Sequence, residues 1–142
     1  MKRVKKYVLT GMLLMLLAVL TGCGTREPET GKKISVYYVN TAETKVEVHD
    51  QYLNTKTSEE QLEETITFLS TTPEKLEYKA PLDMGFRVLD YEVEDGKLLI
   101  NVDKAYSELS PTTEVLVRAA IVRTLTQLPN VKYVGITVED SQ

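Results

Sequence analysis

The sequence has very few of the residues on which disulfides and transition-metal sites depend. Its 142 residues include one cysteine, one histidine and no tryptophan. A lone cysteine excludes a disulfide within the chain, so the stability of the fold has to come from its hydrophobic core. A structural zinc site takes four ligands, mostly nitrogen and sulfur. One histidine and one cysteine fall short of that number.

The N-terminus lacks an apolar run of the length that a membrane span needs. The apolar stretch from Val8 to Leu20 is interrupted by Thr10 and Gly11, and it is shorter than the roughly 20 residues of a transmembrane helix. Four basic residues stand before it, at positions 2, 3, 5 and 6. A basic start followed by a short apolar core is typical of a secretory signal peptide.

The residues at the end of this core, Leu20, Thr21, Gly22 and Cys23, resemble the lipobox of bacterial lipoproteins. Small residues at positions 21 and 22 suit a peptidase that cleaves before the cysteine. The resemblance implies a diacylglycerol group on the cysteine sulfur and a further acyl chain, such as palmitate, on its amine. Two or more chains hold a protein stably on a membrane, at about 0.8 kcal/mol per buried CH₂. We expect a lipid-anchored protein on the extracytoplasmic side of the cell membrane.

Two other interpretations of this segment stay open. The first is a signal anchor that is not cleaved, and the second is a secreted protein with a free thiol. The second is less favoured because a free cysteine is a liability in an oxidising compartment, and lipidation removes it.

The chain that remains after removal of residues 1–22 is short and acidic. Its 120 residues are enough for one small domain. Thirteen Lys and Arg stand against 21 Asp and Glu, a net charge of −8, which makes nucleic acid an unsuitable partner. Residues 23–33 combine the lipidated cysteine with a polar tether that contains one proline and two glycines. The tether would hold the domain, residues 34–142, about 15–20 Å from the membrane.

Strand and helix patterns alternate through this domain in the order β-β-α-β-β-α-β. Alternating apolar residues predict strands at 34–39, 44–49 and 134–138, and a hairpin on either side of Asp95-Gly96. The predicted helices start at Thr57, which forms a capping box with Glu60, and near Ser110-Pro111. We predict an α+β two-layer sandwich with both helices on one face of a mixed sheet. The last strand is expected to be central, and residues 71–85 to be irregular.

Several segments of the domain resemble the GerMN domain, which is named from the N-terminal domain of spore germination protein M of endospore-forming bacteria. The resemblance spans residues 34–138 and is most specific in Thr-Leu-Thr-Gln-Leu-Pro-x-Val. The segments that carry it are ISVYYV at 34–39, Pro81, Asp95-Gly96, INVD at 100–103 and IVRTLTQLPNV at 121–131. Two features depart from the family. The sporulation protein carries tandem copies where this chain has one, and its relatives often end the last strand in Asp-Gly where this chain has Glu139-Asp140.

The resemblance implies an envelope protein without established catalytic residues, and a likeness to ring-building domains of the sporulation channel. We therefore expect a non-enzymatic docking or assembly module in sporulation or spore germination. The expected partners are the membrane, through the lipid, and an envelope protein or the cell wall, with homo-oligomers also open. No cofactor or metal is expected. The alternative is a lipoprotein that binds a small ligand or a cell-wall glycan in a pocket near residues 71–85.

A third hypothesis, an enzyme acting on wall polymers, depends on three carboxylates. Asp90, Glu92 and Glu94 share one face of a predicted strand. Alternate strand positions suit the separation of about 5–9 Å between glycosidase carboxyls, and calcium binds carboxylate oxygens. A solvated strand face explains the same pattern and is the interpretation we favour.

The other candidate side chains have ordinary explanations. His49 falls on a predicted edge strand, where we expect a solvated side chain rather than a base or a metal ligand. The tyrosines expected to be partly exposed are Tyr37, Tyr52, Tyr78 and Tyr106. Exposed tyrosine is common at protein interfaces, but ordinary packing of the ring with a solvated hydroxyl is the interpretation we favour for each of them.

Overall fold

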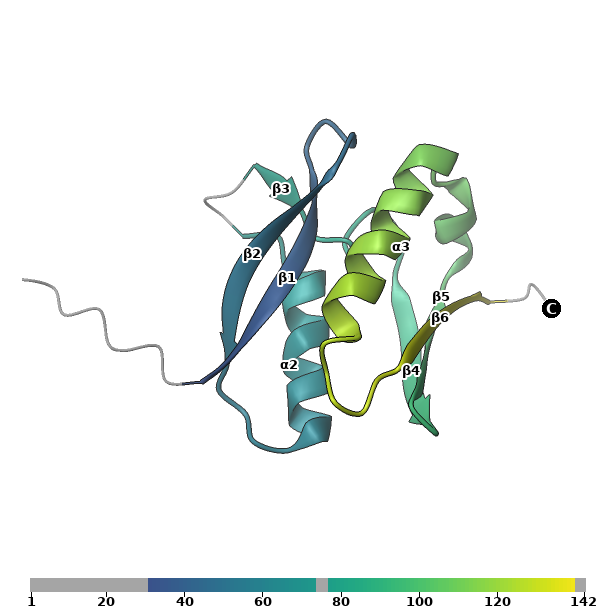
Figure 1. Cartoon of the computed structure of the whole chain (residues 1–142). Coiled ribbons are helices and arrows are strands. Elements are labelled where there is room, and N and C mark those ends of the chain that lie inside the picture. The colour runs from purple at the N-terminus through teal and green to yellow at the C-terminus, as the bar shows by residue number, and fades with distance from the viewer. Residues whose placement is uncertain (1–30, 74–76, 140–142) are drawn as a thin grey trace, which may run out of the picture.

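The computed structural model describes residues 31–73 and 77–139, which form two three-stranded sheets and two α-helices (Figure 1). The lipobox residues Leu20, Thr21, Gly22 and Cys23 lie outside this range, so the anchor remains a prediction. Within the described ranges, no helix is long and apolar enough to cross a membrane. The elements are β1 (Lys32–Asn40), β2 (Val46–Leu53), α2 (Ser58–Ser70), β3 (Tyr78–Lys79), β4 (Val88–Glu94), β5 (Lys97–Val102), the 3₁₀ helix η2 (Lys104–Glu108), α3 (Pro111–Leu125) and β6 (Tyr133–Val138).

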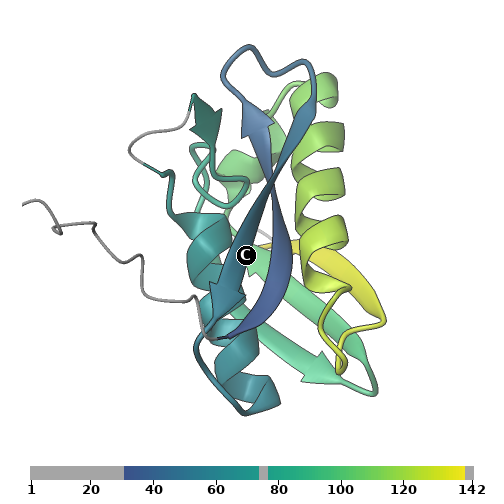
Figure 2. The same cartoon turned by 60° about the vertical axis from the view of Figure 1, so that its left-hand side comes forward.

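The strands divide into two sheets with different pairing. The first sheet has the order β2-β1-β3 and is antiparallel. The second has the order β4-β5-β6, in which β4 is antiparallel and β6 parallel to β5. Figure 1 shows α3 between the two sheets, where it contacts both β1 and β6. Figure 2 shows the β1–β2 hairpin in front of α2, with α3 beside it, and both helices contact β1.

The C-terminal end of α3 occupies the edge of β1 where a further strand would otherwise pair. The Thr124 hydroxyl accepts a hydrogen bond from the Tyr37 N–H at 3.0 Å. The Gln127 side chain accepts one from the Ser35 N–H at 3.0 Å and donates one to the Ser35 carbonyl at 2.7 Å. These side chains satisfy backbone groups that a neighbouring strand normally satisfies. The α+β class and the order of the predicted elements are confirmed, but the expected single sheet is corrected to two, because α3 closes this edge.

Local signals in the sequence correspond closely to local structure. Thr57 caps α2, and the reciprocal hydrogen bonds of the capping box with Glu60 are both present. Ser110 caps α3 by accepting a hydrogen bond from the Thr113 N–H at 3.1 Å. Asp95 and Gly96 both have positive φ, 50° and 83°, which is the type I′ turn predicted for this hairpin.

Three expectations that depended on strand context are wrong. Within residues 31–73 and 77–139, β6 pairs with β5 alone and lies at the edge of its sheet, so it is not central. The alternation of Leu89, Tyr91 and Val93 in the sequence predicts one shared face, but the register shifts between Val88 and Asp90 and Leu89 is 41% exposed. Residues 71–85 are not wholly irregular, since β3 pairs with the end of β1.

One hydrophobic core joins all these elements. The buried side chains come from both sheets and both α-helices, and include Val36, Leu69, Ile100 and Ile121, each without exposed surface. Burying a side chain of this size stabilises a fold by about 1.5–3 kcal/mol. A core that draws on every element fixes how the helices and sheets lie relative to one another.

Candidate functional site

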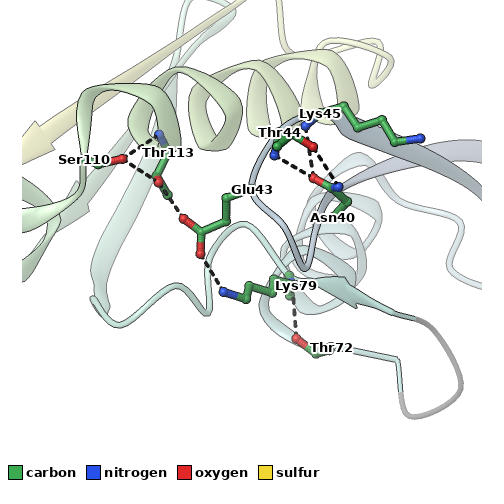
Figure 3. Close-up of polar contacts among 9 residues, drawn as sticks. Asn40, Glu43, Thr44, Lys45, Thr72, Lys79, Ser110 and Thr113 are labelled. Atoms are coloured by element: carbon green, nitrogen blue, oxygen red, sulfur yellow. Dashed lines mark hydrogen bonds and ion pairs between the residues drawn. The ribbon is translucent and has the colours of Figure 1, made fainter.

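Polar side chains from three distant segments meet at the tip of the β1–β2 hairpin (Figure 3). The Glu43 carboxylate forms an ion pair with Lys79 of β3 and accepts a hydrogen bond of 2.6 Å from the Thr113 hydroxyl of α3. The Thr113 hydroxyl in turn lies 2.8 Å from the Ser110 hydroxyl. We call this group of residues, Glu43, Lys79, Ser110 and Thr113, the hairpin junction.

The turn between β1 and β2 positions Glu43 for these contacts. The Asn40 side chain accepts hydrogen bonds from the backbone N–H groups of Thr44 and Lys45 at 2.9 and 3.0 Å. Glu43 has a φ of 52°, a left-handed conformation that costs a non-glycine residue about 1–3 kcal/mol. The contacts of its carboxylate offset this strain, because they attach the turn to β3 and α3.

The electrostatics of the hairpin junction indicate a structural role. The hydrogen-bonded ion pair with Lys79, followed by the Thr113 hydrogen bond, holds the pKa of the Glu43 carboxyl below its ordinary value. Both carboxylate oxygens already have partners within the protein. A carboxylate that is ionised and fully engaged fastens the hairpin and is poorly suited to abstract a proton from a substrate.

The carboxylates singled out from the sequence lie on the open face of the second sheet. Asp90, Glu92 and Glu94 are all exposed on β4. Among the residues that the structure describes, no group of three or more His, Cys, Asp or Glu side chains is placed to hold a metal ion. The geometry agrees with a solvated strand face.

His49 differs from the expectation of a solvated side chain. It is half-buried on β2, on the same face of the first sheet as Tyr38 of β1. Its ring lies 5.4 Å from the Tyr78 ring and 6.4 Å from the Tyr38 ring, centroid to centroid. The expectation is wrong because the strand alternation turns position 49 toward the aromatic side chains of β1 and β3.

The four tyrosines named from the sequence divide into two kinds. Tyr37, Tyr52 and Tyr78 are partly exposed, as expected, whereas Tyr106 is buried against Phe86 at a centroid distance of 5.0 Å. Tyr37 carries the Arg123 guanidinium 4.2 Å above its ring centroid. This stacked pair joins the outer face of β1 to α3.

An apolar stripe runs along the solvent side of α3. Val115 is 66% exposed and Val122 is 37% exposed, with half-buried Ala119 between them at helical spacing. Beside the stripe lies the Arg123–Tyr37 pair, and opposite Tyr37 on β2 is Val48, which is 53% exposed. We call this surface the α3 face. The sequence does not predict this surface, because apolar residues occur around the whole of α3.

A cleft of about 430 Å³ separates the start of α2 from β4. Leu62, Tyr91 and Val93 form its apolar part, and Glu59, Glu63 and Glu92 contribute carboxylates, with Ser58 and Asn130 completing the lining. We call it the α2–β4 cleft. Of these residues only Glu92 was a candidate from the sequence, which placed a pocket near residues 71–85 instead.

The arrangement of two helices and two three-stranded sheets defines the class of GerMN-like α+β domains. The first GerMN domain of the sporulation protein GerM from Bacillus subtilis has a TM-score of 0.57 at 13% identity, covering 78% of this chain and 85% of that one. The tandem GerMN domains of the same protein have a TM-score of 0.54 at 19% identity, covering 84% of this chain and 43% of that one. A Clostridium perfringens protein described as a lipoprotein has a TM-score of 0.50 at 20% identity, covering 78% of this chain and 76% of that one.

The sequence itself matches the model of the Germane family, described as sporulation and spore germination, over residues 35–142, and the chain belongs to this family. The resemblance inferred from the sequence is confirmed. This chain spans less than half the length of the tandem-domain structure. A comparison with curated proteins finds no significant match.

Proposed function

We propose that the protein is a non-enzymatic, lipid-anchored docking module on the extracytoplasmic side of the cell membrane, acting in sporulation or spore germination. Membership of the sporulation and spore germination family supports the process. The similar fold of a Clostridium perfringens protein described as a lipoprotein supports the anchor. The docking role is supported by the surface of the domain.

The observation that carries the docking role is the α3 face. An exposed helix normally turns polar residues to solvent, yet here Val115 and Val122 occupy that side. Apolar side chains bordered by tyrosine and arginine are typical of protein interfaces. Tyr37 and Arg123 provide that border, and their stacking orders both side chains before a partner arrives.

The lipid on Cys23 would make this docking effective. An anchored domain and a membrane partner share a surface, so the encounter takes place at a raised effective concentration. Replacing Cys23 with Ala should release the protein from membranes or leave it unprocessed, as measured by fractionation and intact mass. A Cys23→Ala protein that keeps the mature mass and stays with the membranes would contradict the anchor.

The docking surface is tested by placing a photo-crosslinking amino acid at Val115 in cells that are forming spores. A discrete adduct with one envelope protein is expected at Val115. The same amino acid at Glu77, an exposed residue before β3 that belongs to neither the α3 face nor the strand edge of β4, serves as the control and should give no such adduct. Equal adducts at both positions would overturn the proposal.

A charge placed on the same surface gives an independent measurement. The variant Val115→Asp should fold with an unchanged melting temperature, because the side chain is exposed, but should lower spore formation or germination. Val48→Asp tests the far side of the α3 face in the same way. Normal spore formation and germination in both variants would show that the α3 face is not needed.

A further inference from the structure

The α2–β4 cleft lies beside an outer strand of the second sheet. Tyr91, Glu92 and Val93 are consecutive residues of β4, and all three line the cleft. The cleft therefore borders β4 over three successive positions. Among the described residues β4 pairs with β5 alone, so its other edge carries no neighbouring strand there.

An open strand edge presents backbone donors and acceptors to an incoming chain. In an antiparallel pair, alternate residues of β4 turn their N–H and C=O groups toward β5, and the others turn them outward. An extended peptide satisfies the outward groups by adding a strand, and its alternating side chains then meet the two faces of the sheet. The cleft beside β4 provides the room that such a strand requires.

The two faces at this edge differ in chemistry. On the inner side, Leu62 of α2 lies with Tyr91 and Val93 and forms an apolar surface. On the outer side, Asp90, Glu92 and Glu94 form a row of exposed carboxylates. A strand added here would therefore meet apolar groups and carboxylates at alternate positions.

Carboxylates also approach the cleft from α2. Glu59 and Glu63 line it opposite β4, and burial, followed by the charge of Glu63, raises the pKa of the Tyr91 hydroxyl. None of the five acidic residues around this edge forms an ion pair within the part of the chain that the structure describes. Like charges that face each other across strands are destabilising, so two copies of this edge would repel. The occupant has to be a different, cationic chain.

We propose that the open edge of β4 and the α2–β4 cleft bind an extended segment of a partner protein in which apolar residues alternate with lysine or arginine. The segment joins the second sheet as a strand beside β4. Its apolar side chains contact Leu62, Tyr91 and Val93, and its cationic side chains lie over the carboxylates of β4. This site is separate from the α3 face and names a partner chemistry that the proposed docking function leaves open.

The test uses the full-length lipoprotein in detergent and a fluorescent peptide of alternating valine and lysine, with binding followed by anisotropy. The paired variant Glu63→Lys with Glu92→Lys should bind the peptide about tenfold more weakly, since two attractive charge contacts become repulsive. The matched control, Glu77→Lys with Glu108→Lys, changes the net charge equally at exposed positions outside the cleft and should retain affinity. Equal losses in both variants would reveal unspecific charge attraction and overturn the proposal.

Two further measurements address the geometry of the complex. A peptide of the same composition with its lysines grouped at one end should bind weakly, and the alternating peptide should slow hydrogen exchange at backbone amides of β4. Equal affinity for both peptides, or protection elsewhere in the fold, would exclude strand addition at this edge. The proposal would also be excluded if wall glycan fragments displaced the bound peptide while the changes at Glu63 and Glu92 left peptide affinity unaltered. Val115→Asp should bind the peptide normally, which separates failure of this site from failure of the α3 face.

Discussion

The two sheets differ at one strand edge each: the edge of β1 that faces α3, and the edge of β4 that does not pair with β5. The edge of β1 is closed, because Thr124 and Gln127 take up the backbone groups of Ser35 and Tyr37. The edge of β4 is open and bordered by carboxylates. Unpaired strand edges invite association with other chains. The edge of β1 is therefore part of the fold, whereas the edge of β4 is available to a partner. The acidic side chains beside β4 favour a cationic partner.

The closed edge depends first on the packing of α3. Replacing Ile121, which is fully buried, with Ala should lower the free energy of unfolding by about 2–5 kcal/mol, because the core cannot fill the space left behind. Denaturation in urea measures the change. The neighbouring variant Val122→Ala, on the exposed side of the helix, is the control and should lose less than about 1 kcal/mol. Equal losses in the two variants would contradict the burial of Ile121 and the exposure of Val122.

The hydrogen bond from Thr124 is the next contribution to this edge. Thr124→Val keeps the shape of the side chain but leaves the Tyr37 N–H without its acceptor, which should cost about 1–3 kcal/mol. Thr126→Val is the matched control, since the Thr126 hydroxyl makes the same contact to its own helix backbone without reaching β1. A loss of the same size in both variants would show that the helix contact, and not the strand edge, carries the effect.

The hairpin junction adds a pH dependence at the far end of the closed edge. The pKa of Glu43 is lowered in the folded state, so its contribution to stability is complete above the ordinary value of 4.5 and is lost as the pH falls through the lower folded pKa. Glu43→Gln should therefore be less stable than the natural protein at neutral pH, with the gap narrowing in acid. A gap that is constant between pH 7 and pH 3 would contradict this account.

The open edge should give the smallest change in stability. Glu63→Lys with Glu92→Lys should leave the free energy of unfolding within about 0.5 kcal/mol of the natural value, because both side chains are exposed and form no ion pair with the described residues. Thermal melts measure it. A loss as large as that of Thr124→Val would make these carboxylates part of the fold and remove the contrast between the two edges.

The parts of the fold that neighbouring residues decide were predictable. The capping box of Thr57 with Glu60 and the Asp95-Gly96 turn each involve residues within three positions of one another, and both appear as expected. The bulge at Leu89 was not predictable from alternation, because it depends on how β4 meets β5. His49 was misplaced for a similar reason, since its surroundings come from β1 and β3.

The candidate surfaces show the same division. The row of Asp90, Glu92 and Glu94 is visible in the sequence, but Leu62 and Glu63 reach the cleft only when α2 lies beside β4. The exposed stripe of α3 was hidden because apolar residues occur around the whole helix, and only packing decides which of them remain outside. The Thr-Leu-Thr-Gln-Leu-Pro segment identified the family, yet its contact with β1 joins residues 92 positions apart.

The sequence by itself determined the family, the order of the elements, their caps and turns, and the signal that predicts a lipid anchor. These depend on short-range hydrogen bonding and on the spacing of apolar residues along the chain. The tertiary structure decided that there are two sheets instead of one, which strand edge is closed, and which apolar and acidic side chains face solvent. Each of these results from packing and hydrogen bonds between segments far apart in the sequence, so they are settled only when the core forms.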